Sequence, residues 1–188
     1  DSINHIDKLK SESDRRQFLL NLISFAAAIE GIFFMSAFSY VFFYRSRGFL
    51  QGLATGTNWT MRDETCHMSF AFEVVDIIMR QEPSLITVDL MNQVREMIDD
   101  AIECEYIFAE DMVSHGVVGL SKSNIKQFLK FVADQRLSTL GIKSSYNVTN
   151  PFPFMEFQGT QELTNFFERR VSSYQTGISG SVSLDENF

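Results

Sequence analysis

The sequence is short of the residues that build several common classes of protein. It has two cysteines, three prolines and one tryptophan among 188 residues, which excludes a disulfide-stapled scaffold and a proline-rich linker protein. Acidic residues outnumber basic ones by 24 to 16, which gives a net charge of −8. Because nucleic-acid binding relies on clustered lysine and arginine, we expect no nucleic-acid partner. Two isolated cysteines fit a reducing compartment, and we expect a cytoplasmic protein.

The sequence also lacks a convincing membrane span. Its most apolar run, residues 18–43, is long enough to cross a bilayer, but Glu30 lies near its centre. A carboxylate in the middle of a bilayer is costly. The run is not at the terminus and has no cleavage site, so it does not read as a signal peptide. We therefore predict a buried helix of a soluble bundle and no contact with a membrane.

Helical periodicity dominates what is present. The hydrophobic fraction of 45% is that of a globular domain, and phenylalanine is abundant, with 19 residues. Polar caps, glycine stops and apolar residues at helical spacing predict four long helices. Their predicted ranges are 11–44, 57–81, 86–114 and 123–140. No hairpin signal and no internal repeat appear, so the predicted fold class is all-α, a helical bundle.

Three residues have the chemistry of metal ligands. Glu30 lies in an apolar run, where an unpaired carboxylate is costly, so we expect it to pair with a buried arginine or to bind a metal. Glu64 and His67 are three residues apart and share one helix face. Alone, Glu-x-x-His is a weak signal that many solvated surfaces carry. A buried Glu followed by Glu-x-x-His on the next helix is, however, half the ligand set of a di-iron carboxylate bundle.

Carboxylate oxygens together with imidazole suit iron or manganese better than structural zinc. Asp63 directly precedes Glu64 and points to a different helix face. It is either a carboxylate that accepts a hydrogen bond from a metal-bound histidine or one partner of an ordinary salt bridge, for example with Arg62.

Five segments, in order and at similar spacing, resemble the radical-generating small subunit of class I ribonucleotide reductase. They are AAAIEGIFFMSAFSYVFFYRSRGFLQGL, MRDETCHMSFA, FVADQRLSTLGI, NPFPFME and TNFFERRVSSYQ. The resemblance runs from about residue 25 to residue 188 and is strongest to the eukaryotic and large-DNA-virus branch. It implies the later helices of a ferritin-like bundle over residues 1–174 and a flexible tail over residues 175–188.

The resemblance also implies roles for single residues near the metal. Glu30, Glu64 and His67 match three ligands of a dinuclear iron centre, with manganese as the alternative metal. Phe34 and Phe38, one and two helical turns after Glu30, match the apolar pocket beside the radical site.

Further roles concern radical transfer and docking. Asp63 matches the carboxylate that links a metal-bound histidine to the transfer path, Tyr174 matches the tail tyrosine that relays the radical, and Glu168 matches a glutamate that assists. The last residues, SLDENF, resemble the peptide that docks on the large subunit, with Leu184 and Phe188 as apolar anchors.

The resemblance is incomplete at several positions. The family's first Asp ligand, its first Glu-x-x-His and its radical-bearing Tyr lie on earlier helices, which have no counterpart in this sequence. Trp59 does not stand where the transfer path has its tryptophan, and Thr60 stands where we expect an aliphatic residue. Three explanations stay open: a second polypeptide supplies the earlier helices, the sequence is part of a longer protein, or two copies of the chain combine.

These patterns predict a component of the small subunit of ribonucleoside-diphosphate reductase. We expect three kinds of partner: the large subunit, the upstream half of the small subunit, and a second completed small subunit in a homodimer. One alternative is a non-catalytic homologue that binds the large subunit through its tail. Another is a different di-iron oxidase on the same bundle, which gives Tyr174 no role.

Overall fold

The computed structural model describes residues 9–155 of the chain. Within them the order of elements is α1 (Glu12–Ile23), the π-helical segment η2 (Ser24–Ile29), α2 (Met35–Ser46), α3 (Gln51–Gln81), the 3-10 turn η3 (Pro83–Leu85), α4 (Val88–Met112) and α5 (Lys122–Thr139). No strand occurs in this part of the chain, which confirms the predicted all-α class. The predicted boundary between domain and tail, at residue 174, lies outside the described residues.

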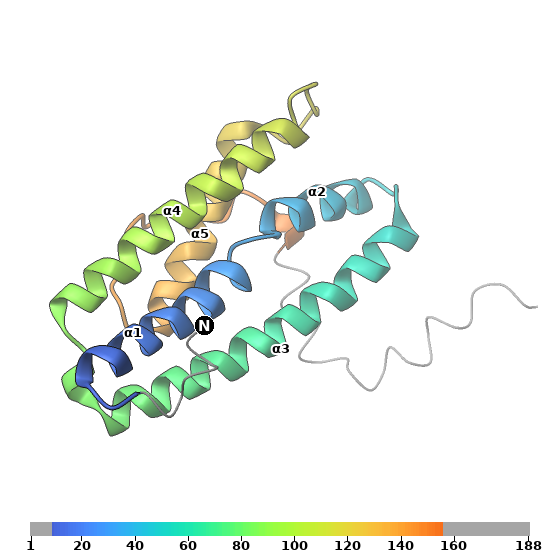
Figure 1. Cartoon of the computed structure of the whole chain (residues 1–188). Helices are drawn as coiled ribbons and strands as arrows, with labels where there is room; N and C mark the ends of the chain where they lie inside the picture. Colours follow the sequence, from blue (N-terminus) through green and yellow to red (C-terminus); the bar gives the residue numbers. More distant parts are fainter. Residues whose placement is uncertain (1–8, 156–188) are drawn as a thin grey trace, which may run out of the picture.

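The helices pack side by side and alternate in direction. Figure 1 shows the chain reversing between α2 and α3, between α3 and α4, and between α4 and α5. The line formed by α1 and α2 lies between α3 and α4, and α5 packs on α4 and α2. The main contacts of α3 are with α1, η2, α2 and η3. Among the described elements, α3 is therefore an edge helix that packs through one side.

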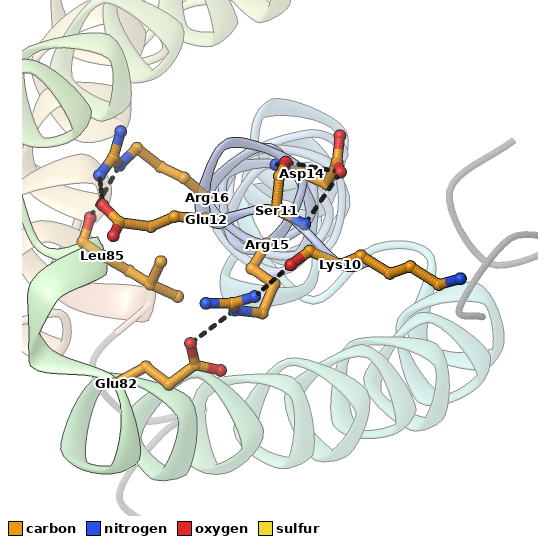
Figure 2. Close-up of polar contacts among 8 residues, drawn as sticks. All are labelled: Lys10, Ser11, Glu12, Asp14, Arg15, Arg16, Glu82 and Leu85. Carbon is orange, nitrogen blue, oxygen red and sulfur yellow. Dashed lines mark hydrogen bonds and ion pairs between the residues drawn. The ribbon is translucent and has the colours of Figure 1, made fainter. Parts of the chain in front are cut away.

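Side chains fix the start of α1 and tie it to the end of α3. The Ser11 hydroxyl oxygen accepts the backbone N–H of Asp14 at 3.0 Å, and the Asp14 carboxylate accepts the backbone N–H of Ser11 at 3.3 Å. This reciprocal capping box agrees with the helix start predicted at residue 11. Figure 2 shows Arg15 Nε donating to the Glu82 carboxylate at 2.6 Å, so α1 and α3 are joined at this end.

A buried carboxylate holds the segment that follows α5. Asp134 Oδ1 accepts the backbone N–H groups of Ser145 at 2.9 Å and of Tyr146 at 3.0 Å. Its Oδ2 accepts the N–H of Asn147 at 2.6 Å. The chain then returns to the bundle, where Phe152 is buried. Phe154 also packs against the core, so this segment directs its aromatic side chains inward.

The prediction of one unbroken helix over residues 11–44 is wrong. The backbone widens into the π-helical segment η2, where the N–H of Glu30 donates to the carbonyl of Phe25 at 3.0 Å, five residues earlier. The chain then turns through Phe34, which has a left-handed φ of 72°, before α2 begins. The other three predicted helices are confirmed, although α3 begins earlier than expected, at Gln51.

A glycine lies in the break between η2 and α2. A Cβ atom on Gly31 would lie 2.4 Å from the carbonyl oxygen of Ala27 and 2.9 Å from that of Ala26. Both distances are shorter than a side chain tolerates, and both atoms belong to the backbone. The break therefore requires glycine at position 31.

The break also divides the apolar run that resembled a membrane span. Residues 18–43 are shared among α1, η2 and α2. None of the helices between residues 9 and 155 combines the length and hydropathy that crossing a bilayer requires.

Candidate metal centre

Two neighbouring segments bring Glu30, Glu64 and His67 together. Glu30 lies at the end of η2, and the other two residues lie one turn apart on α3, which packs against η2. One carboxylate oxygen or imidazole nitrogen from each residue lies within 4.8 Å of the others. His67 Nδ1 is 3.4 Å from Glu30 Oε2 and 3.7 Å from Glu64 Oε2. These are the three residues that the sequence predicted as ligands, and their role as ligands stays a prediction.

The three side chains differ strongly in burial. The side chain of Glu30 is 11% exposed, that of Glu64 25% and that of His67 62%. The cluster therefore has a closed end at η2 and an open end at the exposed imidazole of His67. A group that binds the three residues would reach them from this open side.

The buried carboxylate of Glu30 has an unsatisfied oxygen. Its Oε2 is inaccessible and accepts no hydrogen bond, although His67 Nδ1 lies within ion-pair distance at 3.4 Å. Burial and the nearby Glu64 carboxylate raise the pKa of Glu30, while His67 acts in the opposite direction. Two adjacent carboxylates disfavour each other's ionisation, and a divalent cation between them removes that cost. The donor set of two carboxylates and one imidazole therefore fits iron or manganese.

The structure also bears on the alternative that Glu30 pairs with a buried arginine. Arg136 on α5 reaches the same turn, but its Nε donates to the backbone carbonyl of Gly31 at 3.1 Å. The basic side chain that lies beside the Glu30 carboxylate is the imidazole of His67, with Nδ1 at 3.4 Å from Oε2. These contacts therefore favour His67, and not a buried arginine, as the partner of Glu30.

The phenylalanines expected beside the site lie on either side of the break. Phe38 is 8% exposed, whereas Phe34 is 51% exposed, and their ring centroids are 6.4 Å apart. The expectation that both follow Glu30 along one continuous helix is wrong, because the backbone turns at Phe34. Their part in an apolar pocket stays a prediction.

Asp63 is exposed on α3. Both its role beside a metal-bound histidine and its salt-bridge alternative stay predictions. The other predicted functional residues, Glu168, Tyr174, Leu184 and Phe188, lie outside the described residues.

Sequence reasoning missed two charged residues that contact the backbone next to Glu30. Glu105 on α4 and Arg136 on α5 both contact the break that follows Glu30. A signal existed for each, because both lie in the apolar stripe of their helix: Glu105 between Ile102 and Ala109, and Arg136 beside Leu137. A charge on a buried stripe is uncommon and marks a specific partner.

Comparisons with known proteins agree with the family resemblance seen in the sequence. The family model described as "Ribonucleotide reductase, small chain" matches residues 2–151. The chain is 32% identical over 176 residues to the ribonucleoside-diphosphate reductase subunit beta of Chlamydia pneumoniae, covering 93% of this chain and 50% of the relative. It is 39% identical over 166 residues to the ribonucleoside-diphosphate reductase small chain of Variola virus, covering 88% and 49%. The chain therefore spans about half the length of these relatives.

Solved structures give the same fold. The R2 subunit of a ribonucleotide reductase from Clostridium botulinum superposes with a TM-score of 0.68 at 21% identity, covering 84% of this chain and 49% of that one. The Rnr4 homodimer of the Saccharomyces cerevisiae ribonucleotide reductase gives a TM-score of 0.59 at 27% identity, covering 82% and 44%. This likeness confirms the predicted fold, the later helices of a ferritin-like bundle.

Proposed function

Because this chain belongs to the ribonucleotide reductase small-chain family, we propose that it is a component of the small subunit of ribonucleoside-diphosphate reductase. In that role it supplies one Glu and one Glu-x-x-His, half of the ligand set of a dinuclear carboxylate bundle. The observation that carries the proposal is the cluster of Glu30, Glu64 and His67, in which a buried oxygen of Glu30 has no hydrogen-bond donor.

The chain's own residues have distinct parts in holding the metal. A bound iron or manganese pair supplies the one-electron oxidising power that the reductase needs. Glu30 and Glu64 balance the charge of the cation, and His67 adds a neutral nitrogen from the open side. Since Glu30 is nearly buried, its carboxylate is oriented before a metal arrives, whereas His67 is free to adjust.

Radical transfer is assigned to residues other than the ligands. Asp63, next to the ligand Glu64 on α3, carries the path from the metal-bound histidine, and Tyr174 relays the radical toward the large subunit with the help of Glu168. The tail docks on the large subunit through Leu184 and Phe188. Ribonucleotide substrates bind the large subunit and not this chain.

The open face of α3 supports the need for a second set of helices. Four exposed side chains recur there at spacings of seven and four residues: Trp59, Cys66, Phe70 and Ile77. Apolar side chains at this spacing form a line along which another helix packs. We call the line of these four side chains the seam. We infer that the upstream half of the small subunit covers this face and brings the remaining ligands, and that completed subunits form a homodimer in the cytoplasm.

Iron titration of the chain together with the polypeptide that carries the earlier helices tests the proposal. The expected result is two iron ions per assembled unit, a radical signal after exposure to oxygen, and deoxyribonucleotide formation when the large subunit is added. Tyr174→Phe is expected to keep the iron and to stop turnover. Binding to the large subunit with neither iron nor radical would instead establish the non-catalytic homologue.

A further inference from the structure

The break between η2 and α2 leaves backbone polar groups without helical partners. Carbonyls at the end of a helix and N–H groups at the start of the next one need acceptors or donors from elsewhere. At the two edges of the break, Gly31 and Ser36 are buried, so water does not serve their backbone groups. Two charged side chains from two other helices supply hydrogen-bond partners to the Gly31 carbonyl and the Ser36 N–H.

Glu105 on α4 serves the start of α2. Its side chain is buried, with the residue 5% exposed. The backbone N–H of Ser36 donates to Glu105 Oε1 at 3.1 Å, the Ser36 hydroxyl donates to the same oxygen, and the backbone of Phe34 donates as well. A carboxylate at this place also complements the positive end of the α2 dipole.

Arg136 on α5 serves the end of η2. Its Nε donates to the carbonyl oxygen of Gly31 at 3.1 Å. A cation at this place complements the negative end of the helical segment. The signs of the two side chains therefore match the two helix ends that meet at the break, and Gly31 directly follows Glu30 in the chain.

We propose that Glu105 and Arg136 are positioning residues that hold the break from opposite sides and thereby aim the Glu30 carboxylate at Glu64 and His67. Their hydrogen bonds within residues 9–155 go to Gly31, Phe34 and Ser36 and not to the candidate ligands. Each fixes one end of the short segment between η2 and α2, so the direction of the Glu30 side chain depends on both. This proposal rests on the proposed function in one respect, namely that Glu30 binds a metal. The positioning of the Glu30 side chain itself does not depend on it.

Four variants of the full chain test the positioning role. Glu105→Leu and Arg136→Met remove the polar contact and keep an apolar stem of similar size. Glu105→Gln keeps an acceptor oxygen, and Arg136→Lys keeps a charged donor. Glu96→Leu, which changes an exposed acid of the same helix α4, is the matched control.

Two measurements are made on the metal-free chain by NMR. Amide hydrogen exchange is followed over residues 31–36, and the nuclear Overhauser effect is measured between the side chains of Glu30 and His67. We expect the Leu and Met variants to exchange at least tenfold faster in this segment and to lose the Overhauser effect. We expect the Gln and Lys variants to stay within threefold of the wild type, and the Glu96 control to be unchanged.

Unchanged exchange in folded Leu and Met variants would overturn the proposal, and so would faster exchange with the Overhauser effect intact. If those variants do not fold, Ser36→Ala, which removes one hydrogen bond to Glu105, must speed the exchange of residues 34–36 to sustain it. Binding of Mn²⁺ separates the two proposals. Equal affinity in the wild type and in Glu64→Ala would refute the metal site, while exchange and Overhauser data would still decide the positioning role.

Discussion

Buried acids in this chain fall into two kinds at the scale of single residues. Asp134 and Glu105 accept backbone N–H groups, from the segment after α5 and from the start of α2 respectively, so their burial is compensated. Glu30 is different, because a buried oxygen of its carboxylate has no hydrogen-bond donor within the described residues. A protein keeps such an oxygen at a cost unless something else binds it. This difference sets the candidate metal site apart from the structural acids of the same core.

Asp134 is expected to contribute strongly to stability. Replacing it by alanine leaves three backbone N–H groups without their charged acceptor. We predict that Asp134→Ala lowers the free energy of unfolding by about 2 to 4 kcal/mol, measured by chemical denaturation. Asp134→Asn loses only the acceptor oxygen for the Asn147 N–H, so its free energy of unfolding should lie between those of Asp134→Ala and the wild type. The exposed Asp100→Ala is the control, and an equal effect of both alanine variants would contradict the assignment.

Glu105 is expected to make stability depend on pH. Burial raises the pKa of its carboxyl, although hydrogen bonds from Ser36 oppose the shift. The folded state therefore holds the proton more tightly than the unfolded state, and stability falls as the pH rises from the unfolded pKa through the folded one. We predict that this fall, measured by denaturation across the pH range above about 4.5, is smaller in Glu105→Gln. A fall of equal size in both proteins would assign the pH dependence to other groups.

At the scale of elements, the break between η2 and α2 decides where Glu30 lies. Three of the four helices were predicted correctly from apolar residues that recur at helical spacing, whereas the first predicted helix is divided into α1, η2 and α2. The sequence did not predict the break, since alanines at positions 26–28 favour a regular helix. Gly31 was the one feature of the local sequence that indicated a break. The contacts that stabilise the break come from α4 and α5, far away in sequence, so no local pattern could reveal them.

The same reasoning explains which parts of the site were predictable. Glu64 and His67 were found from their spacing on one helix, and Glu30 from its apolar surroundings. The exposure of Phe34 was not predictable. It follows from the left-handed backbone conformation of Phe34 itself, which the spacing of apolar residues does not reveal.

Gly31→Ala should disrupt the break. A methyl group there would lie 2.4 Å from the carbonyl oxygen of Ala27, so the backbone must shift. We predict a loss of about 1 to 3 kcal/mol in the free energy of unfolding. Gly56→Ala, at an open position of α3, is the matched control and should instead gain about 0.5 to 1 kcal/mol. Two variants of equal stability, measured by thermal or chemical denaturation, would show that position 31 tolerates a side chain.

At the scale of the whole molecule, the described helices carry one cluster of candidate ligands. His67 lies on α3, the helix that also carries an exposed apolar seam, and the chain spans about half the length of its curated relatives. The three candidate ligands, the unsatisfied oxygen of Glu30 and the exposed seam of α3 agree with the proposed completion by further helices. A second set of helices on α3 would cover the seam and close the metal site together.

The tail is expected to act independently of the metal. Residues 183–188 lie outside the described residues, and their acidic sequence ends in an aromatic residue suited to a groove on a partner. We predict that deleting them abolishes binding to the large subunit, measured by calorimetry, and leaves the metal content of the assembled unit unchanged. Unchanged affinity for the large subunit would remove the docking role.

The most direct test of the account is the metal content of the assembled unit, counted by native mass spectrometry for the wild type, Glu64→Ala and Glu73→Ala. Glu73 is an exposed acid on the same helix as Glu64 and is the matched control. The account predicts two metal ions in the wild type and in Glu73→Ala, and fewer than two in Glu64→Ala. Two metal ions retained in Glu64→Ala would contradict it.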